Sequence, residues 1–222
     1  MKKSKVVISG NIGAGKTTFV QWLASKKQMT VYEEEASTNP LLPLFYENPE
    51  KWGFAMQVHM LRTRMETTRK LLEIDSEMGC VQDRSVFEDG LFVEANKKQG
   101  QFHDLLYNEY KELFTVLTKD LHYPDLFIYL YATPEECATR ILVRGRECEK
   151  NMSLNYLKAL HTEYENFFDQ KCKEVPVIIV NSNKLDVNND NDSCYELLYN
   201  FVDKYLLDRT RDVFDGKPIR YN

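Results

Sequence analysis

Residues 10–17 read Gly10-Asn11-Ile12-Gly13-Ala14-Gly15-Lys16-Thr17, a match to the pattern G-x-x-x-x-G-K-T. The motif follows an apolar segment at residues 5–9 and opens a helical pattern at 15–27, the context in which it binds phosphate. Glycines let the backbone wrap closely around a phosphate, and the helix N-terminus supplies positive potential. The motif therefore predicts that Lys16 reaches the β- and γ-phosphates of ATP, that Thr17 holds Mg²⁺, and that Thr18 completes the nucleotide-binding turn.

Short apolar runs alternate with longer helical patterns along the chain. The candidate strands are nearly continuous in apolar residues, as expected for strands covered on both faces of a parallel sheet. They fall at residues 5–9, 29–33, 80–83, 126–131 and 177–180. Helical patterns fall at 15–27, 52–74, 105–121, 154–172 and 193–207, and Thr133-Pro134 marks the start of another helix. This alternation predicts an α/β fold of the P-loop NTPase type, a five-stranded parallel sheet with helices on both faces.

We interpret residues 1–222 as one domain, because neither a linker nor an internal repeat divides the chain. A length of 222 residues is enough to bury a substantial core. Residues 188–192 are predicted to be a polar loop, and residues 208–222 a C-terminal tail without clear periodicity.

Composition excludes several classes of function. The net charge of −5 argues against a general affinity for nucleic acid. No apolar stretch approaches the length of a membrane span, and the N-terminal apolar run is too short for a signal peptide. Five widely spaced cysteines without a C-x-x-C pair are typical of reduced thiols in a cytoplasmic protein. They are Cys80, Cys137, Cys148, Cys172 and Cys194.

Charged residues follow two of the predicted strands, at the sheet edge where α/β proteins bind ligands. The second strand ends in three glutamates at residues 33–35, one of which could accept the proton of an attacking hydroxyl group. Taken alone, these three glutamates fit a solvated acidic turn better than they fit a proton acceptor. The third strand ends in Asp83-Arg84-Ser85. Asp83 is expected to hold Mg²⁺ through water, and Arg84 to meet a phosphate or carboxylate near the acceptor; the alternative is a surface ion pair.

Three arginines lie close together near residue 145. Arg140 and Arg144 share a helix face, and Gly145 permits a turn that redirects Arg146. Like charges on one face of a helix destabilise it, so a shared anionic ligand would explain them. We interpret this segment as an Arg-rich lid that closes over ATP, the alternative being a solvated basic helix end favoured by the helix dipole.

A second nucleotide motif competes with this interpretation. Residues 183–186 fit N-K-x-D, a guanine-recognition pattern, and follow an apolar strand. A GTP-dependent switch also needs D-x-x-G, and no Asp in the chain has Gly three residues later. The switch therefore remains only a minor alternative.

Taken together, the motifs resemble those of the deoxynucleoside kinases, in the family of deoxycytidine, deoxyguanosine and deoxyadenosine kinases as distinct from thymidine kinase 1. The resemblance runs from about residue 5 to residue 207. Besides the P-loop and the acidic strand end, it rests on residues 45–52 (FYENPEKW), Met56-Gln57, Asp83-Arg84-Ser85, and Arg144-Gly145-Arg146 followed by Glu149.

The resemblance implies a role for each matching residue. Glu34 corresponds to the general base that takes the 5′-hydroxyl proton, Arg84 positions that base, and Asp83 stands where the family usually has Glu and assists Mg²⁺. The residues implied in binding the nucleoside are Tyr46 and Glu149 at the sugar 3′-hydroxyl, Gln57, Arg64 and Asp89 at the base, and Met56 packing against it. The implied lid arginines are Arg140, Arg144 and Arg146.

Two departures from the family pattern bear on these roles. The family's Glu-Pro step is Glu34-Glu35 here, so the general base could instead be Glu33 or Glu35. Met56 stands where some members have Phe, which changes how the base is sandwiched. The tail after residue 207 has no counterpart in the pattern.

These observations together predict transfer of the γ-phosphate of MgATP to the 5′-hydroxyl of a 2′-deoxynucleoside. The expected order of substrates is deoxyadenosine first, then deoxyguanosine or deoxycytidine, with thymidine poor. The resemblance also implies a homodimer that packs through the helices near residues 52–74 and 88–120. The alternative is a nucleoside monophosphate kinase such as thymidylate kinase, which shares a P-loop, an Asp-Arg step and a lid.

Overall fold

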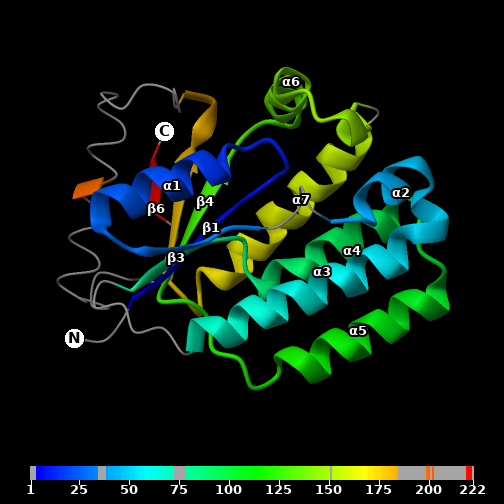
Figure 1. Cartoon of the computed structure of the whole chain (residues 1–222), viewed down its shortest axis with the longest axis horizontal. Coiled ribbons are helices and arrows are strands. Elements are labelled where there is room, and N and C mark those ends of the chain that lie inside the picture. The colour runs from blue at the N-terminus through cyan, green and yellow to red at the C-terminus, as the bar shows by residue number, and fades with distance from the viewer. Residues whose placement is uncertain are drawn as a thin grey trace.

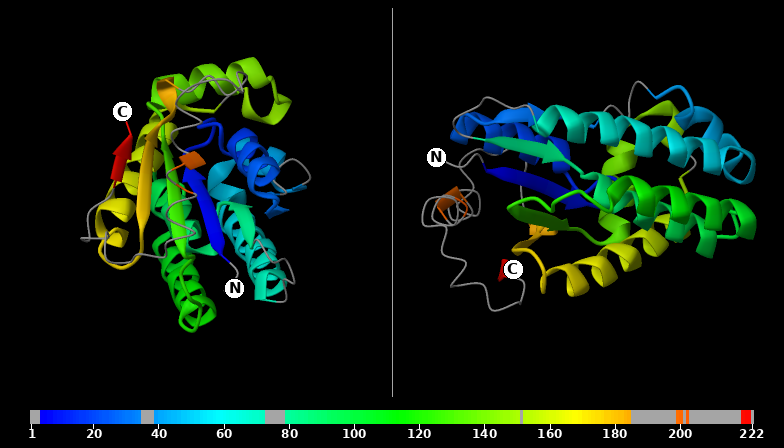
Figure 2. Two further views of the ribbon diagram at one scale, coloured as in Figure 1. Left: turned by 90° about the vertical axis from the view of Figure 1, so that its left-hand side faces the viewer. Right: turned by 90° about the horizontal axis from the view of Figure 1, so that it is seen from below.

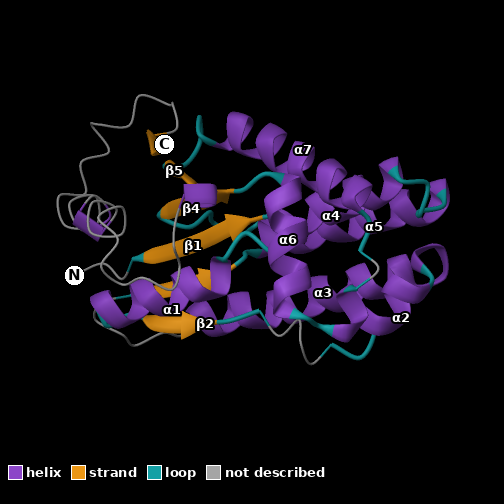
Figure 3. Cartoon of the chain, turned by 90° about the horizontal axis from the view of Figure 1, so that it is seen from above, coloured by secondary structure: helices purple, strands orange, loops and turns teal. Residues whose placement is uncertain are grey.

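A parallel sheet with helices on both faces forms the centre of the molecule (Figures 1 and 3). The structure is a computed structural model that describes residues 4–34, 39–72, 79–150, 152–184, 199–200, 202 and 219–221. The strand order is β2-β3-β1-β4-β5-β6, and every pair is parallel. The strands are β1 (Lys5–Gly10), β2 (Thr30–Tyr32), β3 (Cys80–Asp83), β4 (Leu126–Tyr131), β5 (Val177–Asn181) and β6 (Ile219–Tyr221).

The predicted five-stranded parallel sheet is confirmed, and the structure adds a sixth, three-residue strand at its edge beside β5. Residues 219–221, which the sequence assigned to an irregular tail, pair with β5 in the register Ile178↔Ile219 and Val180↔Tyr221. Residues 219–221 follow a mostly polar stretch and form no continuous apolar run, and their partner strand lies about forty residues away in the chain. The sequence therefore carries no local signal for β6.

The predicted helices are confirmed where the structure describes them, with ends that move by up to three residues. They are α1 (Lys16–Lys27), α3 (Pro49–Leu72), α5 (Asp104–Thr118), α6 (Pro134–Arg144) and α7 (Leu154–Lys171). Two further helices, α2 (Leu42–Glu47) and α4 (Asp89–Lys98), were not predicted as separate elements. Of the predicted helix at 193–207, only residues 199–200 and 202 are described, and they are helical.

The core lies on both faces of the sheet because side chains alternate along each strand. Val6 and Ile8 pack with residues of α1 and α6, whereas Val7 packs with residues of α4 and α7. Figure 2 shows the sheet with helices on both of its sides. A third cluster joins α3, α4 and α5 beyond the sheet. Among the described residues, no helix is long and apolar enough to cross a membrane.

The P-loop is fixed by close contacts that only glycine permits. Gly10 has φ +149°, and a Cβ there would lie 2.7 Å from the Leu130 carbonyl oxygen of β4. Gly13 has φ +83°, and its Cβ would lie 2.6 Å from the Cys137 carbonyl oxygen of α6. The loop therefore packs directly against β4 and α6, and it leads into the N-terminus of α1 beside the ends of β2 and β3.

Candidate active site

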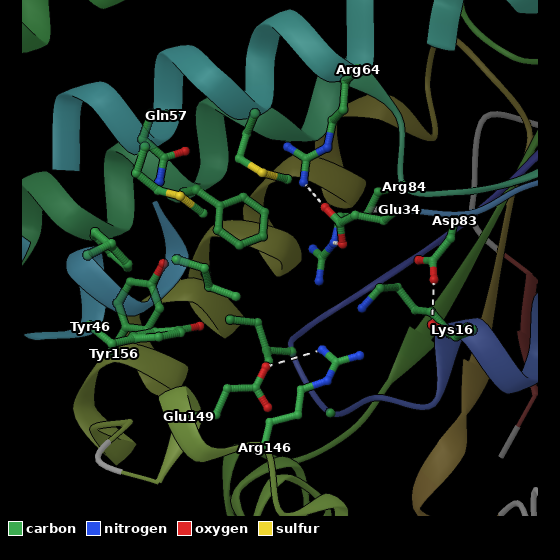
Figure 4. A pocket seen from close by; sticks show the side chains of 18 of the residues that line it. Lys16, Glu34, Tyr46, Gln57, Arg64, Asp83, Arg84, Arg146, Glu149 and Tyr156 are labelled. Carbon is green, nitrogen blue, oxygen red and sulfur yellow. Dashed lines mark hydrogen bonds and ion pairs between the residues drawn. The ribbon is translucent and has the colours of Figure 1, made fainter. Parts of the chain in front are cut away.

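A cavity of about 770 Å³, counted with its open mouth, lies beyond the carboxyl ends of β1, β2 and β3, between α2, α3 and the segment after α6 (Figure 4). Residues predicted from widely separated parts of the sequence line it together. They are Ile12, Gly13, Lys16, Thr17, Glu34, Tyr46, Met56, Gln57, Arg64, Asp83, Arg84, Arg144, Arg146 and Glu149. The fold thus gathers most of the predicted site into one space.

The phosphate end of the cavity is built from the P-loop and the end of β3. The Lys16 Nζ donates to the Asn11 carbonyl oxygen at 2.9 Å. The Thr17 hydroxyl donates to Asp83 Oδ2 at 2.7 Å, while the buried Asp83 Oδ1 has no hydrogen-bond partner among the described residues. A hydroxyl beside a buried carboxylate with a free oxygen is a donor set that suits hydrated Mg²⁺. Thr17 and Asp83 therefore fit the predicted metal.

Burial perturbs both charged groups at this end. Burial lowers the pKa of Lys16 to about 8, and the Arg84 guanidinium adds to this effect. Burial also raises the pKa of Asp83, although Lys16 opposes it. Both groups are thus held in a desolvated space, where charge on a bound phosphate interacts more strongly than it would in water.

Glu34 lies at the centre of the cavity between two arginines. Its Oε2 accepts from Arg84 Nε at 3.1 Å, and its Oε1 contacts Arg64 NH2 (Figure 4). Burial by itself would raise the pKa of the Glu34 carboxyl, but Arg64 and Arg84 outweigh it and lower that pKa to about 2. Glu34 is therefore ionised throughout the physiological range and able to accept a hydrogen bond or a proton.

The geometry distinguishes Glu34 from its neighbour in the acidic run. Glu33 is exposed, and its carboxylate accepts from Gln21 Nε2 of α1 at 2.8 Å, outside the cavity. Glu35 lies outside the described residues. Between the two described glutamates, Glu34 is the one that reaches the site.

The end of the cavity along α3 offers a slot for a flat ring. Met56, Met60 and Phe92 supply apolar walls, and the Gln57 amide lies on the same helix as Arg64. Asp89 is fully buried on α4 and forms an ion pair with Arg64, but it does not itself line the cavity. The predicted contact of Asp89 with a nucleobase stays a prediction.

The end of the cavity between α2 and α7 carries polar groups suited to a sugar. Tyr46 of α2 faces Glu149 and Tyr156 across the space (Figure 4). The Glu149 carboxylate accepts from Arg144 NH2 at 2.5 Å and from Arg146 NH1 at 3.4 Å. Burial raises the pKa of Tyr46 well above its usual value, with Tyr156 and Glu149 adding to the effect, so its hydroxyl stays a donor.

The three predicted lid arginines do not share one environment. Arg144 and Arg146 line the cavity, whereas Arg140 does not. Arg140 NH2 donates to the Ser182 carbonyl oxygen at 2.7 Å, and NH1 donates to the Ala14 carbonyl oxygen of the P-loop at 3.4 Å. Arg140 thus braces the loop from outside, on the side where α6 packs against Gly13.

Sequence reasoning assigned no role in the site to three aromatic residues that line the cavity. They are Phe45, Phe92 and Tyr156, from α2, α4 and α7. Each lies within an apolar helical stripe, so the sequence pattern does not distinguish a wall of the site from an ordinary core position. The signal that identifies them is purely spatial.

Asn183, the first residue of the competing N-K-x-D segment, makes a structural hydrogen bond. Asn183 Oδ1 accepts from the Thr133 N–H at 3.1 Å, just before α6 begins at Pro134. Lys184 is described only as backbone, and residues 185 and 186 lie outside the described part of the chain. Asn183 therefore supports the start of α6.

Comparison with known proteins places this site in a family. A family model described as deoxynucleoside kinase matches residues 6–206. A deoxyadenosine kinase of Dictyostelium discoideum is 37% identical over 181 residues, which make up 82% of this chain and 73% of that protein. A deoxyadenosine/deoxycytidine kinase of Bacillus subtilis is 34% identical over 206 residues, or 91% of this chain and 92% of that protein.

A solved structure agrees with these sequence matches. A deoxyadenosine kinase from M. mycoides with the products dCMP and a flexible dCDP bound superposes with a TM-score of 0.81 at 27% identity. The match covers 90% of this chain and 99% of that chain. The resemblance inferred from the motifs is thus confirmed, and the chain belongs to the deoxynucleoside kinase family.

Proposed function

We propose that this kinase transfers the γ-phosphate of MgATP to the 5′-hydroxyl of a 2′-deoxynucleoside, with deoxyadenosine preferred. The observation that carries the proposal is the position of Glu34. An ionised carboxylate, held by Arg64 and Arg84, lies between a P-loop and a slot with apolar walls. A nucleoside whose base fills the slot would present its 5′-hydroxyl to this carboxylate.

The residues divide the reaction between donor and acceptor. The P-loop and Lys16 bind the β- and γ-phosphates, and Thr17 and Asp83 would hold Mg²⁺, which supplies neutralising charge on the phosphates when bound. Glu34 accepts the proton of the 5′-hydroxyl as the oxygen attacks phosphorus. Arg144 and Arg146 add positive charge from the lid side. Such a transfer depends on positioning and charge stabilisation more than on covalent chemistry.

The polar groups at the slot favour an adenine ring. The Gln57 amide both donates and accepts, which matches the ring nitrogen and exocyclic amine of adenine. Asp89 lies behind Arg64 and does not line the cavity, and we propose that it accepts from an exocyclic amine of adenine or cytosine when a nucleoside binds, because an ionised carboxylate only accepts. Guanine could still be bound through its O6 and N7 by the arginine. Thymine offers an oxygen where the amine would be, and two acceptors would then face each other.

The names of the relatives support deoxyadenosine, deoxyguanosine and deoxycytidine as the candidate substrates. They include deoxyadenosine, deoxyadenosine/deoxycytidine and deoxyguanosine kinases, and the solved M. mycoides deoxyadenosine kinase also has a structure with bound dATP. We therefore propose deoxyadenosine first, then deoxyguanosine or deoxycytidine, and thymidine last. We place the reaction in nucleotide salvage, because its proposed acceptor is a preformed nucleoside, and in the cytoplasm, the location predicted from the widely spaced cysteines.

The test is kcat/KM for the four deoxynucleosides at saturating ATP. Sites built around a polar partner reject analogues that lack it, by up to about 10⁴-fold. We expect thymidine to be at least about tenfold poorer than deoxyadenosine. A thymidine value within tenfold of the best substrate would contradict the assignment of the slot while leaving the kinase assignment intact.

We also propose a homodimer formed through the helices near residues 52–74 and 88–120. The support is an exposed apolar stripe on α5, whose members are Leu105, Leu106, Leu113 and Val116. Leu105 is 68% and Val116 63% exposed, which is unusual for large apolar side chains on one helix face. Sedimentation should give twice the chain mass, and a Leu105→Glu/Val116→Glu variant should give one chain mass. A wild-type monomer at micromolar concentration would exclude the dimer.

A further inference from the structure

Arg84 has an unusual backbone conformation. Its φ is +62°, in the left-handed region that side chains other than glycine rarely occupy. The turn is held by the Arg84 N–H, which donates to the Ile8 carbonyl oxygen of β1 at 3.0 Å. Such conformations persist where the surrounding contacts overdetermine them, and they cluster at functional sites. The contacts of the Arg84 side chain are therefore expected to stabilise this backbone conformation.

The Arg84 guanidinium is enclosed on three sides. Its Nε donates to Glu34, its NH1 donates to the Tyr164 hydroxyl, and its Cζ lies 4.7 Å from the centre of the Phe92 ring. Tyr164 is a fully buried residue of α7 and does not line the cavity. A side chain outside the cavity thus contacts the arginine that contacts the proposed general base.

The chain of hydrogen bonds continues to a buried carboxylate. The Tyr164 hydroxyl donates to Glu88 Oε2 at 2.9 Å, so it accepts from Arg84 and donates to Glu88 at the same time. Glu88 is 0% exposed. Burial raises the pKa of Glu88, and Arg84 with the donors around the carboxylate opposes that effect. The donors suit an ionised carboxylate, which only accepts.

Glu88 also joins two loops of the site. Its Oε1 accepts from the Ser85 N–H at 2.9 Å and from the Ser9 hydroxyl at 2.8 Å. Ser9 directly precedes the P-loop, and Ser85 directly follows Arg84. The contact with Ser85 is a capping box at the short helix of residues 86–88, which explains one carboxylate oxygen. The capping box does not account for the hydrogen bond of Glu88 Oε2, which accepts from the Tyr164 hydroxyl.

We propose that Tyr164 and Glu88 are positioning residues for phosphoryl transfer, acting through Arg84 to hold Glu34 in place relative to the P-loop. Neither residue lines the cavity. Their hydrogen bonds fix the guanidinium, and the guanidinium fixes the Glu34 carboxylate. This inference rests on the proposed function, because it assumes that Glu34 acts on a 5′-hydroxyl.

The first test compares two tyrosine variants from the same buried stack. Tyr164→Phe removes the acceptor of Arg84 NH1 and keeps the ring. Tyr129→Phe is the matched control, because Tyr129 stacks on Tyr164 with centroids 5.7 Å apart and does not line the cavity. We expect Tyr164→Phe to lower kcat about 10- to 100-fold with the KM for deoxynucleoside within about threefold, the pattern of a misplaced reacting group. Tyr129→Phe should keep kcat within about threefold.

The second test asks whether Tyr164 acts through Glu34. In a Glu34→Gln background, where the base is already absent, adding Tyr164→Phe should lower single-turnover rates by less than about threefold. A full additional loss there, or equal kcat for Tyr129→Phe and Tyr164→Phe in the first test, would overturn the inference.

The outcome also separates this inference from the proposed function. If the wild-type protein phosphorylates no deoxynucleoside, the proposed function is wrong. If the wild-type protein is active and Tyr164→Phe has the same kcat, only the positioning role is contradicted. Should Tyr164→Phe be unfolded at the assay temperature, Glu88→Gln carries the same two tests. Glutamine keeps the capping box but loses one acceptor, so the same loss of kcat is expected, and unchanged kcat would contradict the inference.

Discussion

Lys16 illustrates how burial sets the chemistry of a single residue. Its ammonium group is desolvated beneath the P-loop, which lowers its pKa to about 8 in the protein without nucleotide. The protonated form is the one that attracts phosphate. The free enzyme therefore loses this attraction as the pH rises through about 8, whereas a bound phosphate favours the protonated form and raises the pKa.

This difference predicts two distinct pH profiles. We expect kcat/KM for ATP, which reports the free enzyme, to fall as the pH rises above about 8, while kcat stays level to higher pH. In Lys16→Arg the guanidinium does not titrate, so the alkaline fall in kcat/KM should disappear, at a lower absolute rate. Steady-state kinetics from pH 6.5 to pH 9.5 check this, and a wild-type kcat/KM that is constant over the whole range would contradict it.

Glu34 carries the second prediction at the residue scale. Glu34→Gln keeps the shape of the side chain but removes the proton acceptor, so kcat should fall by roughly 10²–10⁴-fold, the usual contribution of a general base. Affinity for the nucleoside should change little. Glu33→Gln is the matched control, because Glu33 is exposed and paired with Gln21. Equal losses in the two variants would mean that the loss does not come from the proton acceptor at Glu34.

Glu35→Gln completes this comparison. The sequence alone left Glu33, Glu34 and Glu35 as candidates, because three adjacent glutamates have no periodicity that distinguishes them. If Glu35→Gln lowers kcat more than Glu34→Gln does, the general base lies one residue further along the chain. The side-chain contacts of Glu34 with Arg64 and Arg84 lead us to expect the opposite.

At the scale of elements, the sugar contact joins α2 to the segment that follows α6. Tyr46 and Glu149 come from these two elements and meet at one end of the cavity. Because both would bind the same 3′-hydroxyl, Tyr46→Phe and Glu149→Gln should each raise the KM for deoxyadenosine, and the double variant should lose less than the sum of the two free-energy changes.

A substrate analogue provides the control for this prediction. A 2′,3′-dideoxynucleoside lacks the hydroxyl, so the wild-type enzyme should use it poorly, and the two variants should differ from wild type less with it than with the parent substrate. Strict additivity, together with equal use of the dideoxynucleoside, would show that the two residues do not meet at the sugar.

The elements also show how much of the fold could be predicted from the sequence. Strands β1 to β5 and the P-loop were predictable because local signals determine them: apolar runs and a glycine pattern tied to a strand and a helix. The short strand β6 was not, because its only signal is its pairing with β5. Family resemblance brought Tyr46, Gln57 and Arg64 into the predicted site, and the fold gathers them along one cavity.

Residues that contact the site only through other residues could not be identified from the sequence. Tyr164 and Phe92 lie in apolar helical stripes that read as core, and Glu88 reads as part of a helix cap. Their contacts with Arg84 or its partners appear only when α4, α7 and the end of β3 come together. Arg140 is the opposite case: the sequence predicted it as a lid residue of the site, but it lies outside the cavity and donates to a P-loop carbonyl oxygen.

At the scale of the whole molecule, one sheet edge brings donor and acceptor together. The P-loop follows β1, Glu34 follows β2 and Asp83 ends β3, so three parallel strands deliver the phosphate site and the proton acceptor to the same edge. In the proposed function, the slot along α3 selects the nucleoside that is phosphorylated. A kinase for nucleoside monophosphates would need a cationic site for the acceptor phosphate, whereas here Arg64 and Arg84 are already engaged with Glu34.

The most direct test of the account is the identity of the acceptor. Wild-type protein is incubated with MgATP labelled at the γ-phosphate and either deoxyadenosine or its 5′-monophosphate, and the products are separated. The account predicts labelled deoxyadenosine 5′-monophosphate from the nucleoside and no labelled diphosphate from the monophosphate. Labelled diphosphate formed from the monophosphate, with the nucleoside left unchanged, would contradict it.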